Sequence, residues 1–471
     1  MRPEEDDRLS AAVARYAASA SQVEWSAPSE LRRRASSRRH RQRLALSSTG
    51  TLLLAACLAI TLTLPSNGPA PRVASGTKTL ASQVKRAVVP PGSPSELAVE
   101  SAEQRFALQL TQRLVNNGHV GNVVLSPESI EATLAMLELG ARGATQHEIA
   151  GLLGSVNVRP TEQAAGWNAL TAQLASDARG TGGELTDENA VFVQRTLPVR
   201  PSYLNALKRN FGAGIEQVDF QAGGAKAAGA INSWVSRATG ARIPQLFGTS
   251  SLPPITSLVL VDAMRFSGRW QWSFAKSQTA LGRFDLSNGK SVNVPMMHLV
   301  AKLRYFSVHQ LEGVVLPYAG GRFDAIAVEP RSGSLSSVVL GLTPASLTAL
   351  ATSTRLDPVA IAIPRFSVSS EASLDDSLRA MGLAGAFASG ADFSGISASP
   401  LRLGTVAQRD VLSVDESGTD ATGASGVGVV PLSLHGQMQT ISFDHPFLFV
   451  IRDNATGAII TDALVADPSH S

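Results

Sequence analysis

The chain has 471 residues, of which 44% are apolar, and its formal net charge is +3. That apolar fraction is ordinary for a globular protein and excludes disorder of the whole chain, and so small a net charge argues against nucleic acid as a partner. Because Cys57 is the only cysteine, intrachain disulfides are excluded and the fold must be stabilised by packing.

The N-terminal 43 residues form a polar, basic segment that ends with seven arginines in twelve residues. From Leu44 to Leu64 follow 21 residues without a charged side chain, about the length that spans a bilayer. Arginines on the N-terminal side favour a cytoplasmic N-terminus. We therefore expect residues 1–43 to be a cytoplasmic segment and residues 44–64 to be a single transmembrane signal anchor in the cell membrane, with the remainder of the chain extracytoplasmic.

A second interpretation of the same stretch remains open. Leu54-Ala55-Ala56-Cys57 resembles a bacterial lipoprotein cleavage box, in which the cysteine carries the lipid, although the leader would be unusually long. Both interpretations place the rest of the chain outside the cytoplasm. Residues 65–94 contain several Pro, Ser and Gly residues and are predicted to be a linker.

After residue 94 the sequence carries helical patterns. Apolar residues recur at helical spacing from Glu96 to Val115, and the stretch from Asn122 to Gly154 predicts two amphipathic helices. Ser126 is placed to cap the first of these two helices, and Thr145 with Glu148 forms a capping-box pattern for the second.

Strand patterns alternate with these helices. The segment from Glu188 to Val193 has the composition of a buried strand, and the nearly continuous apolar run from Ser257 to Phe274 is typical of a strand buried on both faces. The segments 401–414 and 447–464 predict a further strand and a terminal hairpin. Together the patterns predict an α+β domain that covers residues 95–471.

The sequence lacks motifs that would indicate an enzyme. His147-Glu148 has no second histidine at the spacing of a zinc-protease motif, and neither a GxSxG elbow nor a phosphate-binding glycine loop occurs. The eight histidines are scattered along the chain. We therefore expect no catalysis, no metal site and no cofactor.

A run of small residues lies between Val414 and Phe447. Such runs are usually flexible linkers, but this one lies near the C-terminus and is followed by strand-like sequence, so it does not join two domains. Its residues also have a period of two, which puts Thr419, Ala421 and Gly423 on one face. The run can therefore remain outside as an exposed loop or enter a sheet as an additional strand.

Over roughly the last four-fifths of its length the chain resembles the serpins, the suicide inhibitors of serine proteases. The segment that begins at Glu416 resembles the hinge of these proteins, where Glu, Gly, Thr and small residues recur in this order, and Ser126-Pro127 resembles the start of their core helix. The resemblance implies a hinge formed by Glu416, Gly418, Thr419, Asp420, Ala421, Gly423 and Ala424.

The resemblance also implies residues for two regions of the main sheet. The shutter, where the sheet parts, corresponds to Ser126, Ser129, Asp262 and Gln408, and the breach, where the loop first enters, corresponds to Trp270. Many serpins have Asn and His at the positions of Asp262 and Gln408. Because a buried Asp needs a hydrogen-bond donor, we expect the Gln408 amide to contact Asp262.

The implied structure is the serpin fold, a multi-helix domain with a large central mixed β-sheet and an exposed reactive-centre loop. The usual family spacing of sixteen residues beyond Glu416 places the reactive bond between Leu432 and Ser433. Leucine before the bond suits chymotrypsin-like or elastase-like serine proteases, which have apolar pockets. The implied activity is that of a monomeric inhibitor whose loop is cleaved and then inserts into the sheet, which traps the acyl-enzyme.

Two alternatives remain open. Gly423, Gly426 and Gly428 each lose roughly 0.5–1 kcal/mol relative to Ala when they are fixed in a strand, which favours a serpin-fold protein that binds or supports other molecules without inhibiting. Inhibition of a cysteine protease is the other alternative.

Overall fold

The computed structural model describes residues 78–90, 92–118, 121–238, 241, 243–248, 252, 256–308, 310–352, 356–420 and 438–470, without the side chains of residues 187–189, 238, 262–263 and 371–372. Ser75–Ser471 forms one compact unit. The predicted cytoplasmic segment, the predicted span from Leu44 to Leu64 and Cys57 lie outside the described residues.

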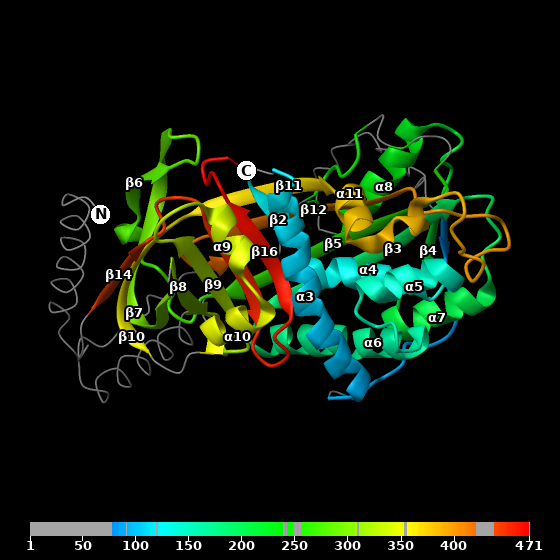
Figure 1. Cartoon of the computed structure of the whole chain (residues 1–471), viewed down its shortest axis with the longest axis horizontal. Helices are drawn as coiled ribbons and strands as arrows, with labels where there is room; N and C mark the ends of the chain where they lie inside the picture. Colours follow the sequence, from blue (N-terminus) through cyan, green and yellow to red (C-terminus); the bar gives the residue numbers. More distant parts are fainter. Residues whose placement is uncertain are drawn as a thin grey trace, which may run out of the picture. The chain divides into compact units, whose positions relative to one another are not determined.

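In the described part of the chain, the first sheet, here called sheet A, has the strand order β1-β4-β3-β5-β13-β12-β11, and Figure 1 shows β11, β12, β5, β3 and β4 side by side. Its strands are β1 (Lys78–Leu80), β3 (Glu184–Gln194), β4 (Ile215–Val218), β5 (Leu258–Arg269), β11 (Phe366–Ser373), β12 (Thr405–Val414) and β13 (Gly418–Thr419). Parallel and antiparallel neighbours occur together, so the sheet is mixed as predicted.

The second sheet, here called sheet B, follows the order β14-β10-β7-β8-β9-β15-β16-β2, and β6 pairs with β7 beside this path. Its strands are β2 (Val123–Leu125), β6 (Ala280–Asp285), β7 (Ser291–Val308), β8 (Leu311–Pro317), β9 (Phe323–Pro330), β10 (Asp357–Pro364), β14 (Gln439–Ser442), β15 (Phe447–Asp453) and β16 (Ile459–Val465). The register Phe447↔Val465 confirms the predicted terminal hairpin.

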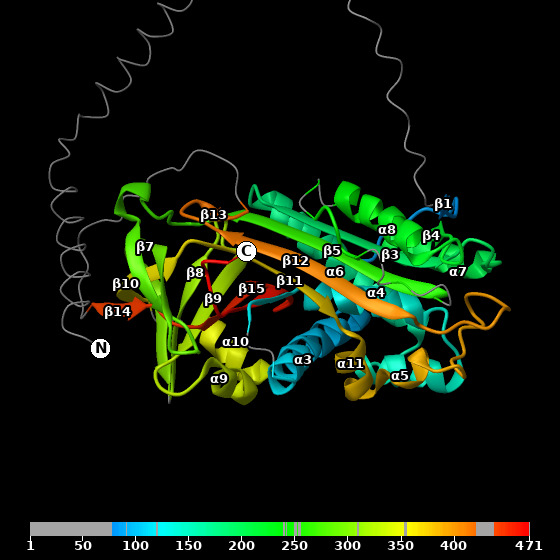
Figure 2. The same ribbon diagram turned by 90° about the horizontal axis from the view of Figure 1, so that it is seen from above.

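Helices pack on both faces of sheet A (Figure 2). The described helices of the domain are α3 (Pro94–Asn116), α4 (Pro127–Glu138), α5 (Gly143–Leu152), α6 (Pro160–Gly180), α7 (Pro201–Phe211), α8 (Gly224–Ala238), α9 (Leu335–Gly341), α10 (Pro344–Thr352) and α11 (Asp375–Leu378). Helix α8 buries Ile231 on one face, against Phe192, Val261 and Ala407 of the sheet. Figure 2 shows α3, α4 and α5 on the opposite face.

Local sequence signals explain several helix boundaries. Ser93 accepts a hydrogen bond from the Glu96 amide at 3.2 Å and caps α3, which begins at Pro94 as its fixed φ favours. Helix α7 ends at Gly212, whose φ of 70° lies in the left-handed region that glycine adopts without strain.

The predicted capping box of Thr145 and Glu148, at the start of the second amphipathic helix, is wrong. Helix α5 begins at Gly143, and the Thr145 hydroxyl accepts the Asp392 amide at 2.9 Å while Glu148 accepts the Gly385 amide at 2.7 Å. Both side chains therefore bind a segment distant in the sequence, which a local pattern cannot reveal.

The predicted linker is only partly a linker. Within it, Lys78–Leu80 forms β1, which pairs antiparallel with β4 at the edge of sheet A. The Ala87 amide donates to the Arg209 carbonyl of α7 at 2.7 Å. Residues 78–90 are therefore held on the domain, because an edge strand offers unpaired backbone groups to a passing chain.

In the described part of the chain, no helix taken singly has both the length and the apolarity to cross a bilayer. Helices α9 and α10 reach that limit only as a pair, and they are bent against each other by 101°.

Candidate functional site

Two strands at the centre of sheet A, β5 and β12, pair directly over only part of their length. The parallel ladder joins Thr405–Gln408 to residues 259–262, and β13 lies between the two strands at the other end, where Thr419 pairs with Gly268 and Val414. Residues 263–267 of β5 and 409–413 of β12 belong to neither of these ladders. This interval of about 16 Å is where the sheet can accept a longer strand.

Strand β13 is the beginning of such a strand, and it contains two of the predicted hinge residues. Thr419 is 1% exposed, and its hydroxyl lies 2.6 Å from the Tyr318 hydroxyl. A Cβ atom at Gly418 would lie 2.0 Å from the Gly268 carbonyl oxygen. Glycine is therefore required at 418, and a small polar residue fits the buried position at 419.

Trp270, the predicted breach residue, holds the turn that precedes β13. Its ring nitrogen donates to the Asp415 carbonyl at 3.0 Å, and its backbone amide donates to the Ser417 carbonyl at 2.9 Å. The indole stacks on Tyr318 with ring centroids 4.5 Å apart. One aromatic pair thus positions both the turn and the Thr419 hydroxyl.

Asp420 marks the point where β13 ends. Its φ of 46° is left-handed, a conformation that Asp tolerates better than most residues. The Arg265 guanidinium donates to its carboxylate at 2.5 Å, and its backbone amide donates to the Ser413 carbonyl at 2.9 Å. One contact joins Asp420 to β5 and the other joins it to β12.

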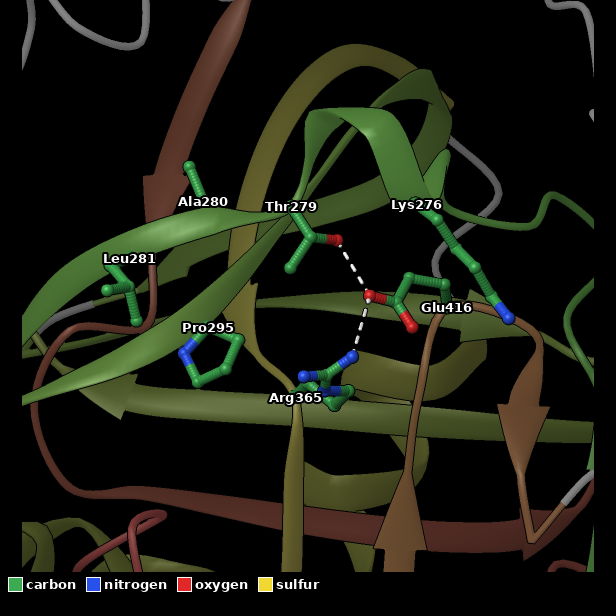
Figure 3. Close-up of a pocket in the computed structure, with 7 residues that line it drawn as sticks. All are labelled: Lys276, Thr279, Ala280, Leu281, Pro295, Arg365 and Glu416. Carbon is green, nitrogen blue, oxygen red and sulfur yellow. Dashed lines mark hydrogen bonds and ion pairs between the residues drawn. The ribbon is translucent and has the colours of Figure 1, made fainter.

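Glu416, the first predicted hinge residue, closes one side of a pocket of about 350 Å³ (Figure 3). Its buried carboxylate accepts a hydrogen bond from the Thr279 hydroxyl at 2.7 Å and lies 3.6 Å from the half-exposed Arg365 guanidinium. The pocket is lined by Lys276, Thr279, Ala280, Leu281, Pro295, Arg365 and Glu416. The hinge is therefore held through the Glu416 side chain, by residues that flank β6 and β10, as well as through the turn.

The predicted shutter residues come together beneath the closed end of the β5–β12 pair. Ser126, Ser129 and Gln408 are all buried, and the Gln408 amide donates to the Ser126 carbonyl at 3.4 Å. The backbones of Gln408 and Asp262 are register partners. The Asp262 side chain lies outside the described side chains, so its contact with the Gln408 amide stays a prediction. Ser126 precedes α4 at the N-cap position without a side-chain cap.

A buried carboxyl group on β12 escaped the sequence analysis. Asp410 is 2% exposed, and burial raises its pKa to about 8; the Ser126 hydroxyl opposes this shift and the Asp462 carboxyl adds to it. Burial likewise raises the pKa of Asp462 to about 7. A sequence signal existed, because Asp410 shares the period of two that buries Val406, Gln408 and Leu412.

Further acids lie behind this pair. Burial raises the pKa values of Glu103 on α3 and Glu131 on α4 well above their usual range, and each also feels a neighbouring carboxyl group. Glu103 accepts the Ile459 amide with both oxygens at 3.1 Å. In the described part of the chain, no group of three or more His, Cys, Asp or Glu side chains is arranged to hold a metal ion.

The remaining predicted site residues are Ala421, Gly423 and Ala424 of the hinge and Leu432 and Ser433 of the reactive bond. All five lie outside the described residues. The structure thus brings the first half of the predicted hinge to the breach, and it gathers the shutter residues at the opposite end of the β5–β12 pair.

Comparison with known proteins identifies the family of this chain. The model of the family described as Serpin (serine protease inhibitor) matches residues 101–468. The chain belongs to the serpin family. Its sheets and helices are those of the serpin fold, and the members of this family are generally inhibitors of serine proteases rather than enzymes.

Similar serpins come from distant organisms. Iripin-2 of Ixodes ricinus is 34% identical over 369 residues, which cover 77% of this chain and 92% of that protein. The human leukocyte elastase inhibitor is 31% identical over 373 residues, 77% of this chain and 97% of that protein. Among solved structures, human thyroxine-binding globulin in complex with thyroxine matches with a TM-score of 0.71 and 27% identity, covering 79% of this chain and 99% of that one.

Proposed function

We propose that this serpin inhibits serine endopeptidases as a suicide substrate. The observation that carries the proposal is the position of β13, because Gly418 and Thr419 already lie between β5 and β12, and beyond them residues 263–267 of β5 and 409–413 of β12 are not joined by a ladder. After cleavage the loop can extend β13 toward the shutter. The inserted residues then pair their backbone groups with β5 and β12 and bury their small side chains.

The chemistry comes from the protease. Its serine attacks the bond after Leu432 and forms an acyl ester with that residue, and Ser433 leaves with the new amino terminus. Release of the loop lets residues beyond Thr419 enter the sheet, and the attached protease moves with them before water can hydrolyse the ester. The uncleaved protein is then kinetically rather than thermodynamically stable.

Chymotrypsin-like or elastase-like enzymes are the proposed targets, because Leu432 suits an apolar pocket. Similarity to the leukocyte elastase inhibitor supports this choice at the level of the family. Incubation with chymotrypsin and with an elastase, followed by denaturing electrophoresis and mass spectrometry, tests the proposal. We expect an SDS-resistant complex and a cut after Leu432. Cleavage without a complex would reject inhibition, and a cut N-terminal to Val427 would reject the assigned bond.

A non-inhibitory binding role is the second candidate. The glycines at 423, 426 and 428 favour it, since each resists being fixed in a strand, and the similar thyroxine-binding globulin carries a small ligand. Heat stability separates the two candidates. An inhibitor gains stability after loop cleavage, whereas a protein whose loop stays outside does not. Papain in place of the serine proteases tests inhibition of a cysteine protease.

We also propose that the chain is attached to the cell membrane through the segment from Leu44 to Leu64, with the serpin domain outside the cytoplasm. The support is the uncharged 21-residue length and the arginines before it. Resistance of the full chain to alkaline extraction from membranes tests attachment. Labelling of Cys57 with a lipid would favour the lipoprotein alternative.

A further inference from the structure

Basic residues gather where the chain joins the domain. Residues 31–95 and 189–215 contain no Asp or Glu, although residues 75–471 as a whole have 30 Lys and Arg against 32 Asp and Glu. The two acid-free stretches contribute seven basic residues to what we call the basic end face: Lys78, Lys85, Arg86, Arg195, Arg200, Lys208 and Arg209.

The fold brings the two stretches side by side. Besides the backbone hydrogen bond from Ala87 to Arg209, the Asn168 side chain of α6 donates to the Ala87 carbonyl at 2.8 Å, and Ser82 donates to Asn205 of α7 at 2.5 Å. Residues 78–90 thus form a strap across α6 and α7. The positive charges of the strap and of α7 therefore share one surface.

This surface lies far from the hinge. Leu80 pairs with Ile215 of β4, Ile215 pairs with Val191 of β3, and Val191 pairs with Leu260 of β5. The hinge pairs with Gly268, eight residues further along β5, which corresponds to roughly 26 Å. Figure 2 shows β1, β4 and α7 together at one end of sheet A and β13 at the other.

The charges of the face are available to a partner. Within the described residues, Lys78, Lys85, Arg200, Lys208 and Arg209 form no ion pair with a carboxylate.

The two acids that follow directly after the second acid-free stretch bind neutral side chains. Glu216 is buried and accepts the Thr79 hydroxyl at 2.6 Å, and Asp219 accepts the Gln194 amide at 3.3 Å. Val88, the most exposed large apolar residue described, is 96% exposed on the strap. The face therefore combines excess positive charge with one apolar tip.

We propose that the basic end face docks on an anionic phospholipid surface and holds the domain with its hinge end directed away from the membrane. The inference rests on the proposed membrane attachment. Only thirteen residues, 65–77, separate the proposed span from β1, a reach of at most about 45 Å when extended. Each Lys or Arg near an anionic bilayer is attracted by the negative surface potential, so several together suffice to orient a tethered domain.

The test uses the full chain reconstituted in lipid nanodiscs with an acceptor dye in the headgroups. In a Cys57→Ala background, one donor dye is attached through Val88→Cys on the strap, and another, in a separate variant, through Ser287→Cys in the β6–β7 turn. We expect energy transfer from position 88 to rise about twofold when anionic lipid replaces neutral lipid, and to fall again at high salt. Transfer from position 287 stays low in both lipids.

Charge reversal identifies the surface. Lys85→Glu with Arg209→Glu should abolish the rise at position 88, whereas Lys290→Glu with Lys302→Glu, the same change on exposed residues of the β6–β7 turn and of β7, should leave it intact. Equal transfer in neutral and anionic discs overturns the proposal, as does a rise that survives reversal of the face. Binding of a sulfated polysaccharide without any response to lipid assigns the face to a polyanion instead. Alkaline extraction and the protease assay are scored separately, so failure of the anchor or of inhibition is distinguished from failure of docking.

Discussion

The hydroxyl groups of Thr419 and Tyr318 lie 2.6 Å apart and form a buried hydrogen bond between the hinge and the residue that follows β8. Tyr318 also stacks on Trp270, which holds the preceding turn. The start of the reactive loop is therefore docked by specific polar contacts as well as by backbone pairing. Substitution of single side chains can therefore test which contacts hold the hinge in the sheet.

The hydroxyl pair should behave as a unit. Thr419→Val or Tyr318→Phe alone leaves one buried hydroxyl without its partner, which costs about 1–3 kcal/mol, whereas the double variant removes both polar groups and loses less than the sum. Urea unfolding midpoints of the four proteins measure the coupling. Strictly additive losses would show that the two hydroxyls do not stabilise each other.

Charge at the hinge should convert the inhibitor into a substrate. In Thr419→Arg a long cation replaces a side chain that is 1% exposed, so the loop cannot enter the sheet quickly enough to trap the acyl-enzyme. We expect cleavage to continue and the SDS-resistant complex to disappear. Val411→Arg adds the same charge on the outward face of β12, where Val411 is 43% exposed, and should retain the complex. A stable complex formed by the Thr419 variant would refute the role of the hinge.

The close approach at Gly418 predicts a different defect. Gly418→Ala puts a methyl group against the Gly268 carbonyl, so β13 must leave its place between β5 and β12. Hydrogen exchange at the Thr419 amide should then become faster by orders of magnitude, without global unfolding. Gly151→Ala is the control, because a Cβ atom there meets nothing within 4 Å. Unchanged exchange in the first variant would mean that the backbone can relax around the methyl group.

Buried Asp410 predicts that stability decreases as pH rises. Its pKa is raised to about 8 in the folded protein by burial, whereas the unfolded chain releases this proton near pH 4. The folded state therefore binds more protons between these values, and each pH unit in the window removes up to about 1.4 kcal/mol of stability. Asp462, Glu103 and Glu131 act in the same direction.

Asp410→Asn should flatten this dependence, since the amide does not titrate. Urea midpoints measured between pH 4 and 8 give the comparison, and Asp376→Asn at an exposed carboxyl supplies the control. If the Asn variant retains the full slope, the other buried acids carry the effect.

Much of the fold could be predicted from the sequence because periodicity and family motifs act locally. The helix expected from Glu96 to Val115 is α3, and the apolar run from Ser257 is β5. The strap 78–90 could not be predicted, because it lies within the stretch 65–94, whose Pro, Ser and Gly residues are typical of a linker, and because its hydrogen bonds go to α6 and α7. The same limit applies to Thr145 and Glu148, whose partners lie more than 200 residues away.

The candidate site likewise contains residues that the sequence predicted and residues that only the structure shows. Trp270 and Thr419 were accessible through the resemblance, since the motif names the residue type at each position. The residues that fix the hinge, Tyr318, Thr279 and Arg265, belong to other strands and turns. Their roles depend on the pairing of distant segments and emerge only in three dimensions.

The anchoring of Glu416 should depend more on Thr279 than on Arg365. The Thr279 hydrogen bond, at 2.7 Å, reaches a carboxylate that is 3% exposed, whereas the Arg365 guanidinium is half exposed and 3.6 Å away. Loss of a buried hydrogen bond costs about 1–3 kcal/mol, but an ion pair that water screens contributes less than about 1 kcal/mol.

Thr279→Val should therefore loosen the hinge more than Arg365→Gln, with faster hydrogen exchange at the Ser417 amide and a lower urea midpoint. Thr279→Ser keeps the donor and should preserve the behaviour of the unmodified protein. The opposite ranking of Thr279→Val and Arg365→Gln would mean that charge, rather than the directed hydroxyl contact, holds the first residue of the loop.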